Sequence, residues 1–118
     1  LVGSNTAWCH PILFQRIQKN RQERGAKVVV IDPRRTATGE EADLFLAIRP
    51  GTDTALFSGL LTHLSQTGVL DRDFIANHTS GFGDALGRAT DIAGGIPATA
   101  TSTGIAERDI ETFFELFR

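Results

Sequence analysis

Three short polar turns contain most of the residues that could bind a charged ligand. They run from Gly3 to Cys9, from Asp32 to Arg35 and from Pro50 to Asp53, and each follows a short apolar segment. If these apolar segments are parallel strands, their carboxyl ends meet at one edge of a sheet, where open α/β sheets bind ligands. The sequence therefore predicts that the three turns share one rim of the sheet.

The first turn has the composition of a phosphate-binding loop. Gly3 allows a ligand to approach the backbone closely, and Ser4, Asn5 and Thr6 place short polar groups beside the start of a helix. Unpaired backbone N–H groups at a helix start favour phosphate. The turn lacks the second and third glycines of the dinucleotide-binding fingerprint. An ordinary polar turn would have the same composition, so both interpretations stay open.

The second turn offers an acid followed by two guanidinium groups. Asp32 ends an apolar strand, where a carboxylate can accept hydrogen bonds from ribose hydroxyls. Arg34 and Arg35 provide planar donors for a phosphate, or surfaces that stack on a base. A helix cap followed by a solvated basic pair would explain the same residues.

The third turn places the carboxylate of Asp53 in the first turn of a predicted helix. Helix electrostatics favour an acid there, and on this turn alone that explanation is preferred. The functional alternative is that Asp53 accepts two hydrogen bonds from the N1–H and N2–H₂ groups of guanine. Adenine has no equivalent pair of donors, so such a site would select guanine.

No set of residues for catalysis or metal binding is visible in the sequence. The three histidines, His10, His63 and His78, are interpreted as structural or solvated, and Trp8 either stacks on a base or covers the first turn. Cys9 is the single cysteine, so an internal disulfide and a cysteine-rich cluster are excluded. We predict a binding domain that contains no catalytic and no metal-ligating residue.

The composition excludes several partners. The 118 residues carry a formal net charge of −2, which gives no electrostatic reason to expect nucleic acid or an anionic membrane as a partner. The longest apolar run, Leu44 to Ile48, is far shorter than the roughly 20 residues that span a bilayer. The composition suits a cytoplasmic protein.

The order of predicted elements favours an α/β fold. Leu1-Val2 is read as the end of a strand that begins outside this chain, followed by a helix from Pro11 to Gly25 and strands at Lys27–Ile31 and Leu44–Ile48. Thr52 is positioned to cap a helix that extends to about Gln66. Right-handed crossovers then give a three-layer Rossmann-like domain with a mainly parallel sheet.

The second half of the chain is less readable. Asp71 begins a short helix, the stretch from Thr79 to Gly104 gives no clear pattern, and a last helix opens at Thr103 or Ala106. Its apolar face is predicted to contain Ile110, Phe113, Phe114 and Phe117. Residues 1–118 are expected to form a single domain, a fragment of a larger enzyme. A truncated first strand would leave an open edge, so we expect marginal stability or a homodimer.

Four ordered blocks resemble the molybdopterin oxidoreductase family. They are Gly3-Ser4-Asn5-Thr6-Ala7-Trp8-Cys9-His10-Pro11, Val30 to Thr36, Ala42-Asp43, and Arg49-Pro50-Gly51-Thr52-Asp53. Within the family the pattern is most similar to the nitrate reductases, and next to the formate dehydrogenase alpha subunits. The resemblance covers nearly the whole chain and is weakest from about Asp84 to Gly104.

The resemblance implies a bis-molybdopterin guanine dinucleotide cofactor, with this domain holding the guanosine diphosphate part of one dinucleotide. The implied binding positions are Gly3, Ser4, Asn5, Thr6, Trp8, Cys9, Ile31, Asp32, Pro33, Arg34, Arg35, Gly51, Thr52 and Asp53. The molybdenum ligand and a 4Fe-4S cluster are expected only in the full-length protein. The partners are then the other domains of the parent oxidoreductase, and the fragment alone is expected to be inactive. A nicotinamide- or flavin-binding Rossmann domain and a noncatalytic interaction module are the alternatives.

Overall fold

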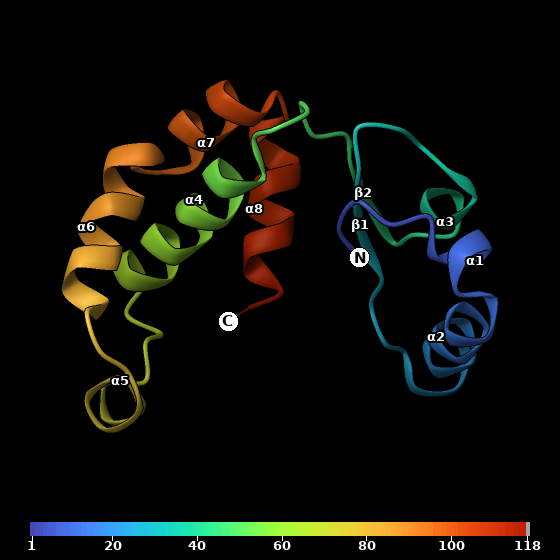
Figure 1. Cartoon of the computed structure of the whole chain (residues 1–118), viewed down its shortest axis with the longest axis horizontal. Coiled ribbons are helices and arrows are strands. Elements are labelled where there is room, and N and C mark those ends of the chain that lie inside the picture. The colour runs from blue at the N-terminus through green and yellow to red at the C-terminus, as the bar shows by residue number, and fades with distance from the viewer. Residues whose placement is uncertain (118) are drawn as a thin grey trace. The chain divides into compact units, whose positions relative to one another are not determined.

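A computed structural model describes residues 1–117, which divide between Arg49 and Pro50 into two compact units (Figure 1). Each unit has its own set of buried apolar side chains. In the first unit they are Val28, Val30, Ile31, Leu46 and Ile48. In the second they are Ala55, Leu56, Leu60, Ala89, Ala93, Ile105, Ile110, Phe113 and Phe114.

The first unit is organised around a small parallel sheet. Strands β1 (Val29–Ile31) and β2 (Leu44–Leu46) pair in parallel, which confirms the predicted neighbours although both strands are shorter than expected. Val2 forms a parallel bridge to Ile31. The bridge is made by Ile31 N–H donating to the oxygen of Leu1, and by Gly3 N–H donating to the oxygen of Ile31, both at 2.9 Å. β1 is therefore bonded on both of its edges.

Three helices complete the first unit, and the first of them corrects a prediction. Residues Thr6–Cys9, expected to belong to a turn, form the short helix α1, because the oxygen of Asn5 accepts the N–H groups of Trp8 and Cys9. Helix α2 (Pro11–Arg24) starts on a proline and ends at Gly25, whose φ of +68° is readily adopted only by glycine. Helix α3 (Ala37–Glu40) precedes β2.

Asp43 joins the end of α2 to the start of both strands. Its carboxylate accepts hydrogen bonds from Arg21 Nε at 2.9 Å, from Arg21 Nη2 at 3.2 Å and from the backbone N–H of Val28 at 2.9 Å. The Arg21 hydrogen bond, followed by the Val28 N–H, lowers the pKa of Asp43 below its ordinary value. Ionised Asp43 is thus the form that the fold favours.

The second unit is helical. Its elements are α4 (Asp53–Gln66), α5 (Arg72–His78), α6 (Phe82–Ile92), α7 (Ile96–Thr103) and α8 (Glu107–Glu115). Helix α4 packs against α6 and α7, and α7 packs against α8. The short helix predicted to begin at Asp71 is α5, and the Asp71 side chain caps it by accepting the N–H of Phe74 at 2.8 Å.

Two helices fill the stretch that gave no clear pattern in the sequence. Helix α7 buries Thr99 and Thr103, and such residues give no apolar periodicity. Helix α6 does carry Phe82, Leu86 and Ile92 at helical spacing, a signal that sequence reasoning missed. Phe117 also departs from expectation, because it is half exposed while Ile110, Phe113 and Phe114 are buried. The last helix ends at Glu115, so Phe117 lies outside the helical repeat.

Gly59 sets the distance between α4 and α7. A Cβ atom at this position would overlap Thr99 Oγ1 and lie 3.1 Å from Thr99 Cβ. Thr99 is fully buried and its hydroxyl donates to the oxygen of Gly95 at 2.8 Å, so it has little room to move. The close approach of these two helices therefore depends on the missing side chain.

Taken over the described residues, the chain is a helix-rich α/β protein with a small parallel sheet. The three-layer Rossmann-like arrangement and the homodimer stay predictions. Within residues 1–117, no helix combines the length and the apolar character needed to cross a membrane.

Replacing Gly59 by alanine should lower the free energy of unfolding by about 1–3 kcal/mol, because the added methyl group forces α4 and α7 apart. Urea denaturation followed by circular dichroism measures the change. Gly87→Ala is the matched control, since a Cβ at Gly87 in α6 meets nothing within 4 Å. The control should be neutral or stabilising by up to about 1 kcal/mol, and equal effects of the two variants would contradict the packing argument.

Asp43→Asn should weaken the fold by roughly 1 kcal/mol at neutral pH, because the amide loses the charge that holds Arg21. The pKa of Asp43 is lowered in the folded chain, so its contribution is complete above the unfolded value of 3.8. The stability difference between wild type and variant should shrink as pH falls below that value. Denaturation at several pH values tests this, with Glu111→Gln on an exposed part of α8 as control. A difference that does not change with pH would contradict the assignment.

Candidate functional site

The first two polar turns lie together in the first unit. They line a cavity of about 380 Å³, to which the first turn contributes Asn5 and Trp8 and the second segment contributes Arg34, Arg35, Thr36 and Ala37. The Trp8 side chain is 77% exposed, so its ring is available for stacking. The structure thus confirms that these two turns, separated in sequence by a helix and a strand, form one surface.

Three backbone N–H groups of the first turn have no hydrogen-bond partner among the described residues. Within residues 1–117, the N–H groups of Ser4, Asn5 and Thr6 make no hydrogen bond, whereas the N–H of Gly3 pairs with Ile31 in the sheet. Gly3 has a φ of +57°, and a Cβ there would meet nothing within 4 Å. Successive free N–H groups at a turn form a favourable environment for an anion.

A buried threonine connects the first turn to α3. The hydroxyl of Thr38 donates to Oδ1 of Asn5 at 2.9 Å and accepts the backbone N–H of Ala7 at the same distance. Thr38 is fully buried, and it does not line the cavity itself. Sequence reasoning missed this residue, because a threonine in a polar stretch carries no pattern that distinguishes it from a surface residue.

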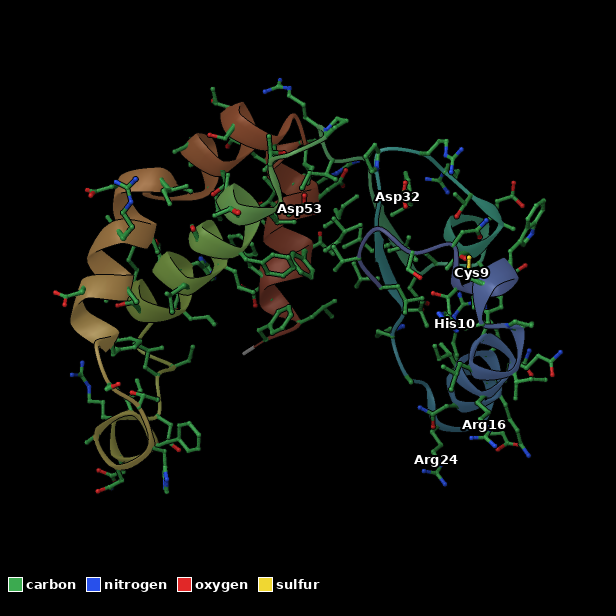
Figure 2. All side chains as sticks on the ribbon, in the orientation of Figure 1. Cys9, His10, Arg16, Arg24, Asp32 and Asp53 are labelled. Carbon is green, nitrogen blue, oxygen red and sulfur yellow. The ribbon has the colours of Figure 1, made fainter. Side chains whose placement is uncertain are left out.

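Asp32 directly follows β1 (Figure 2). Its Oδ1 accepts the backbone N–H of Arg34 at 2.8 Å. Oδ2 makes no hydrogen bond to the residues that the structure describes, so it can accept one from a ligand. Ile31, in contrast, is buried in the core, and its backbone N–H and oxygen are both engaged in the sheet.

Phe45 supports the guanidinium group of Arg35. The central carbon of that group lies 4.3 Å from the ring centroid, a cation–π geometry. The ring also passes close to Gly39, where a Cβ would lie 2.9 Å from it. Arg35 is therefore held at the cavity by Phe45 and by a 3.4 Å hydrogen bond from Nη1 to the oxygen of Gly39. Arg35 stays exposed, as do Pro33 and Arg34.

The third turn belongs to the second unit. Gly51 adopts a φ of +79°, and Thr52 occupies the N-cap position of α4. Asp53 is the first residue of that helix (Figure 2). The carboxylate of Asp53 is partly exposed. The prediction that this turn shares a rim with the other two stays a prediction.

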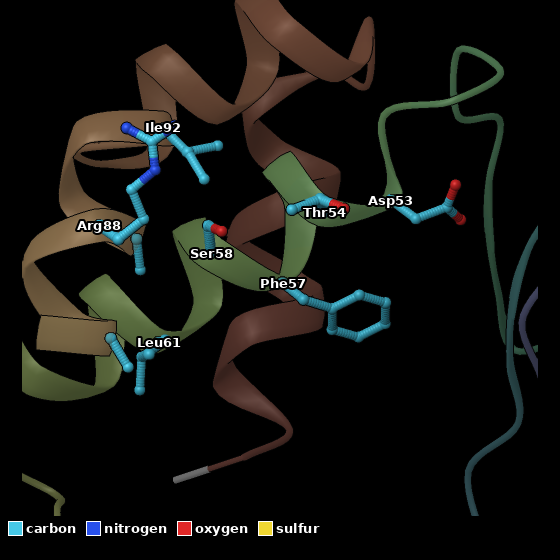
Figure 3. A pocket seen from close by; sticks show the side chains of 9 residues that line it. Asp53, Thr54, Phe57, Ser58, Leu61, Arg88 and Ile92 are labelled. Atoms are coloured by element: carbon cyan, nitrogen blue, oxygen red, sulfur yellow. The ribbon is translucent and has the colours of Figure 1, made fainter. Parts of the chain in front are cut away.

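A second cavity of about 530 Å³ lies between α4 and α6 (Figure 3). Its lining is mostly apolar, and the carboxylate of Asp53 points away from Arg88 and Ile92 of α6. The sequence gave no sign of this cavity, because α6 itself was not predicted. It lacks the grouped donors of the first cavity and is the weaker candidate despite its larger volume.

The three histidines and Cys9 do not form a cluster of reactive side chains in the described part of the chain. The ring of His63 packs on Phe114 with centroids 5.3 Å apart, and the ring of His78 packs on Phe74 at 4.9 Å. His10 and Cys9 are exposed beside the start of α2 (Figure 2). In the part of the chain that the structure describes, no three histidine, cysteine or acidic side chains are grouped so that they could hold a metal ion.

The chain is similar in sequence to several known oxidoreductases. A nitrate reductase of Shewanella frigidimarina is 44% identical over 116 residues, covering 98% of this chain and 12% of the relative. A formate dehydrogenase subunit alpha of Methanocaldococcus jannaschii is 42% identical over 82 residues, covering 70% of this chain and 12% of the relative. Among solved structures, acetylene hydratase from Pelobacter acetylenicus matches with a TM-score of 0.76 and 31% identity, covering 96% of this chain and 15% of that one.

These relatives are much longer than this chain, which spans about 12% of the curated ones named here. The family described as "Molybdopterin oxidoreductase" matches residues 1–105, which is most of the sequence. The match includes all three polar turns and both strands. The chain belongs to the molybdopterin oxidoreductase family.

Proposed function

We propose that this chain is a cofactor-binding domain of a molybdenum oxidoreductase, and that it holds the guanosine diphosphate part of bis-molybdopterin guanine dinucleotide. The family implies a molybdenum–pterin cofactor. The observation that carries the proposal is the cavity that unites Asn5 and Trp8 with Arg34 and Arg35. Its donors and its planar side chains suit a nucleotide diphosphate.

Different residues of the first unit bind different parts of the nucleotide. The free N–H groups of Ser4, Asn5 and Thr6 and the guanidinium groups of Arg34 and Arg35 bind the diphosphate oxygens. The free carboxylate oxygen of Asp32 accepts a hydrogen bond from a ribose hydroxyl.

Asp53 of the second unit is proposed to recognise guanine. Its carboxylate can accept both the N1–H and the N2–H₂ of that base, which together present two donors on one edge. Asp53 is the first residue of α4, and helix electrostatics favour an acidic side chain at that position. Gly51 and Thr52 shape the turn that leads to it.

Nitrate reduction is the proposed activity of the complete enzyme, because several relatives are named nitrate reductase. The relative named formate dehydrogenase makes formate oxidation the second candidate. When bound, the cofactor supplies the molybdenum redox chemistry, and a 4Fe-4S cluster of the complete protein is part of the same proposal. This chain contributes binding and orientation, and we propose a cytoplasmic location for the parent enzyme.

The chain should bind guanosine diphosphate more tightly than adenosine diphosphate, and Asp53→Asn should remove most of that preference. We expect about a tenfold loss of affinity for the guanine nucleotide and little change for the adenine nucleotide, because the amide has only one acceptor atom. Isothermal titration calorimetry with both nucleotides measures the effect. Asp84→Asn, in the first turn of α6, is the matched control. A preference for adenosine diphosphate in the wild type would contradict the proposal.

A further inference from the structure

Thr38 is the only side chain that hydrogen-bonds across the two walls of the cavity in the described part of the first unit. Its hydroxyl is hydrogen-bonded to Asn5, which lies 33 residues away in the sequence, and to the N–H of Ala7, which lies 31 residues away. One wall of the cavity carries Asn5, and the other begins at Arg34 and extends into α3. The contact therefore fixes the position of α1 against α3.

The direction of these hydrogen bonds determines how the Asn5 amide is turned. The Ala7 N–H occupies an acceptor site on Thr38 Oγ1, and the hydroxyl proton is donated to Asn5. Asn5 must then present its oxygen to Thr38, which leaves both N–H bonds of its Nδ2 free. An amide so oriented offers donors to the cavity and favours an acceptor, such as a phosphate oxygen, over a hydroxyl proton.

The burial of Thr38 makes this arrangement durable. The residue is fully buried, so water does not compete for its hydroxyl. Without the hydrogen bond from Thr38, the Asn5 amide could rotate so that its oxygen and its nitrogen exchange places. The oxygen would then face an anion and repel it. An anchored amide avoids the free-energy cost of ordering it when the ligand binds.

We infer that Thr38 is a positioning residue, which orients the Asn5 amide so that its two N–H groups face the diphosphate of a bound nucleotide. The inference rests on the proposed function for the identity of the ligand. The orientation of Asn5 is a property of the chain itself. Thr38 acts through Asn5 and does not touch the nucleotide.

Two substitutions separate the hydroxyl from the shape of the side chain. Thr38→Val keeps the branched shape and removes the hydroxyl, whereas Thr38→Ser keeps the hydroxyl. Calorimetry with guanosine diphosphate should show about a tenfold weaker affinity for Thr38→Val and near wild-type affinity for Thr38→Ser. Guanosine, which lacks phosphate, should bind all three proteins equally, because Asn5 faces only the diphosphate. A general disturbance of the fold would weaken both ligands, and equal losses would overturn the inference.

A second readout needs no ligand. In nitrogen-15 spectra, the side-chain amide of Asn5 should shift toward solvent-exposed values in Thr38→Val, and hydrogen exchange at the Ala7 N–H should accelerate, while Thr38→Ser stays close to wild type. If the wild type binds no guanosine diphosphate, the proposed function fails for this chain, and these spectra alone decide the orientation of Asn5. Unchanged Asn5 and Ala7 signals in Thr38→Val would overturn the positioning role whatever the nucleotide result.

Discussion

Backbone hydrogen bonds on both edges of β1 hold the first unit together, and the candidate site depends on them. One edge pairs with the segment before Gly3 and the other pairs with β2. Because all three segments run in the same direction, the turns after Val2 and Ile31 emerge at the same end of the sheet. This pairing therefore places the first turn and Asp32 at the same end of the sheet.

The sequence predicted this pairing because its signals are local and strong. The run of β-branched residues before Asp32 indicates a buried strand, and Pro11 and Gly25 mark the ends of α2. The rule that ligands bind beyond the carboxyl ends of parallel strands then identified two turns that the structure does place together. The relation of the third turn to these two depends on long-range packing, which local signals do not contain.

Sequence reasoning missed α6 and α7 for different reasons. Helix α7 packs through threonines, whose burial cannot be read from hydrophobic periodicity, whereas the helical spacing of Phe82, Leu86 and Ile92 in α6 was a readable signal. Buried threonines in α7 satisfy their hydroxyls within their own helix, as Thr103 does by donating to the oxygen of Thr99 at 2.8 Å. Thr38 differs because its partners lie more than 30 residues away, so only the folded chain reveals its role.

Gly59 also has a consequence for which arrangements of the second unit are allowed. It is the single glycine of α4, and the side chain of Thr99 in α7 packs into the space that a Cβ atom at Gly59 would occupy. Sliding α7 by one helical turn would set Thr99 against the side chain of Ala55 or His63 instead. The missing side chain at Gly59 therefore favours this register of the two helices over alignments shifted by one turn, in which Thr99 would face a Cβ atom.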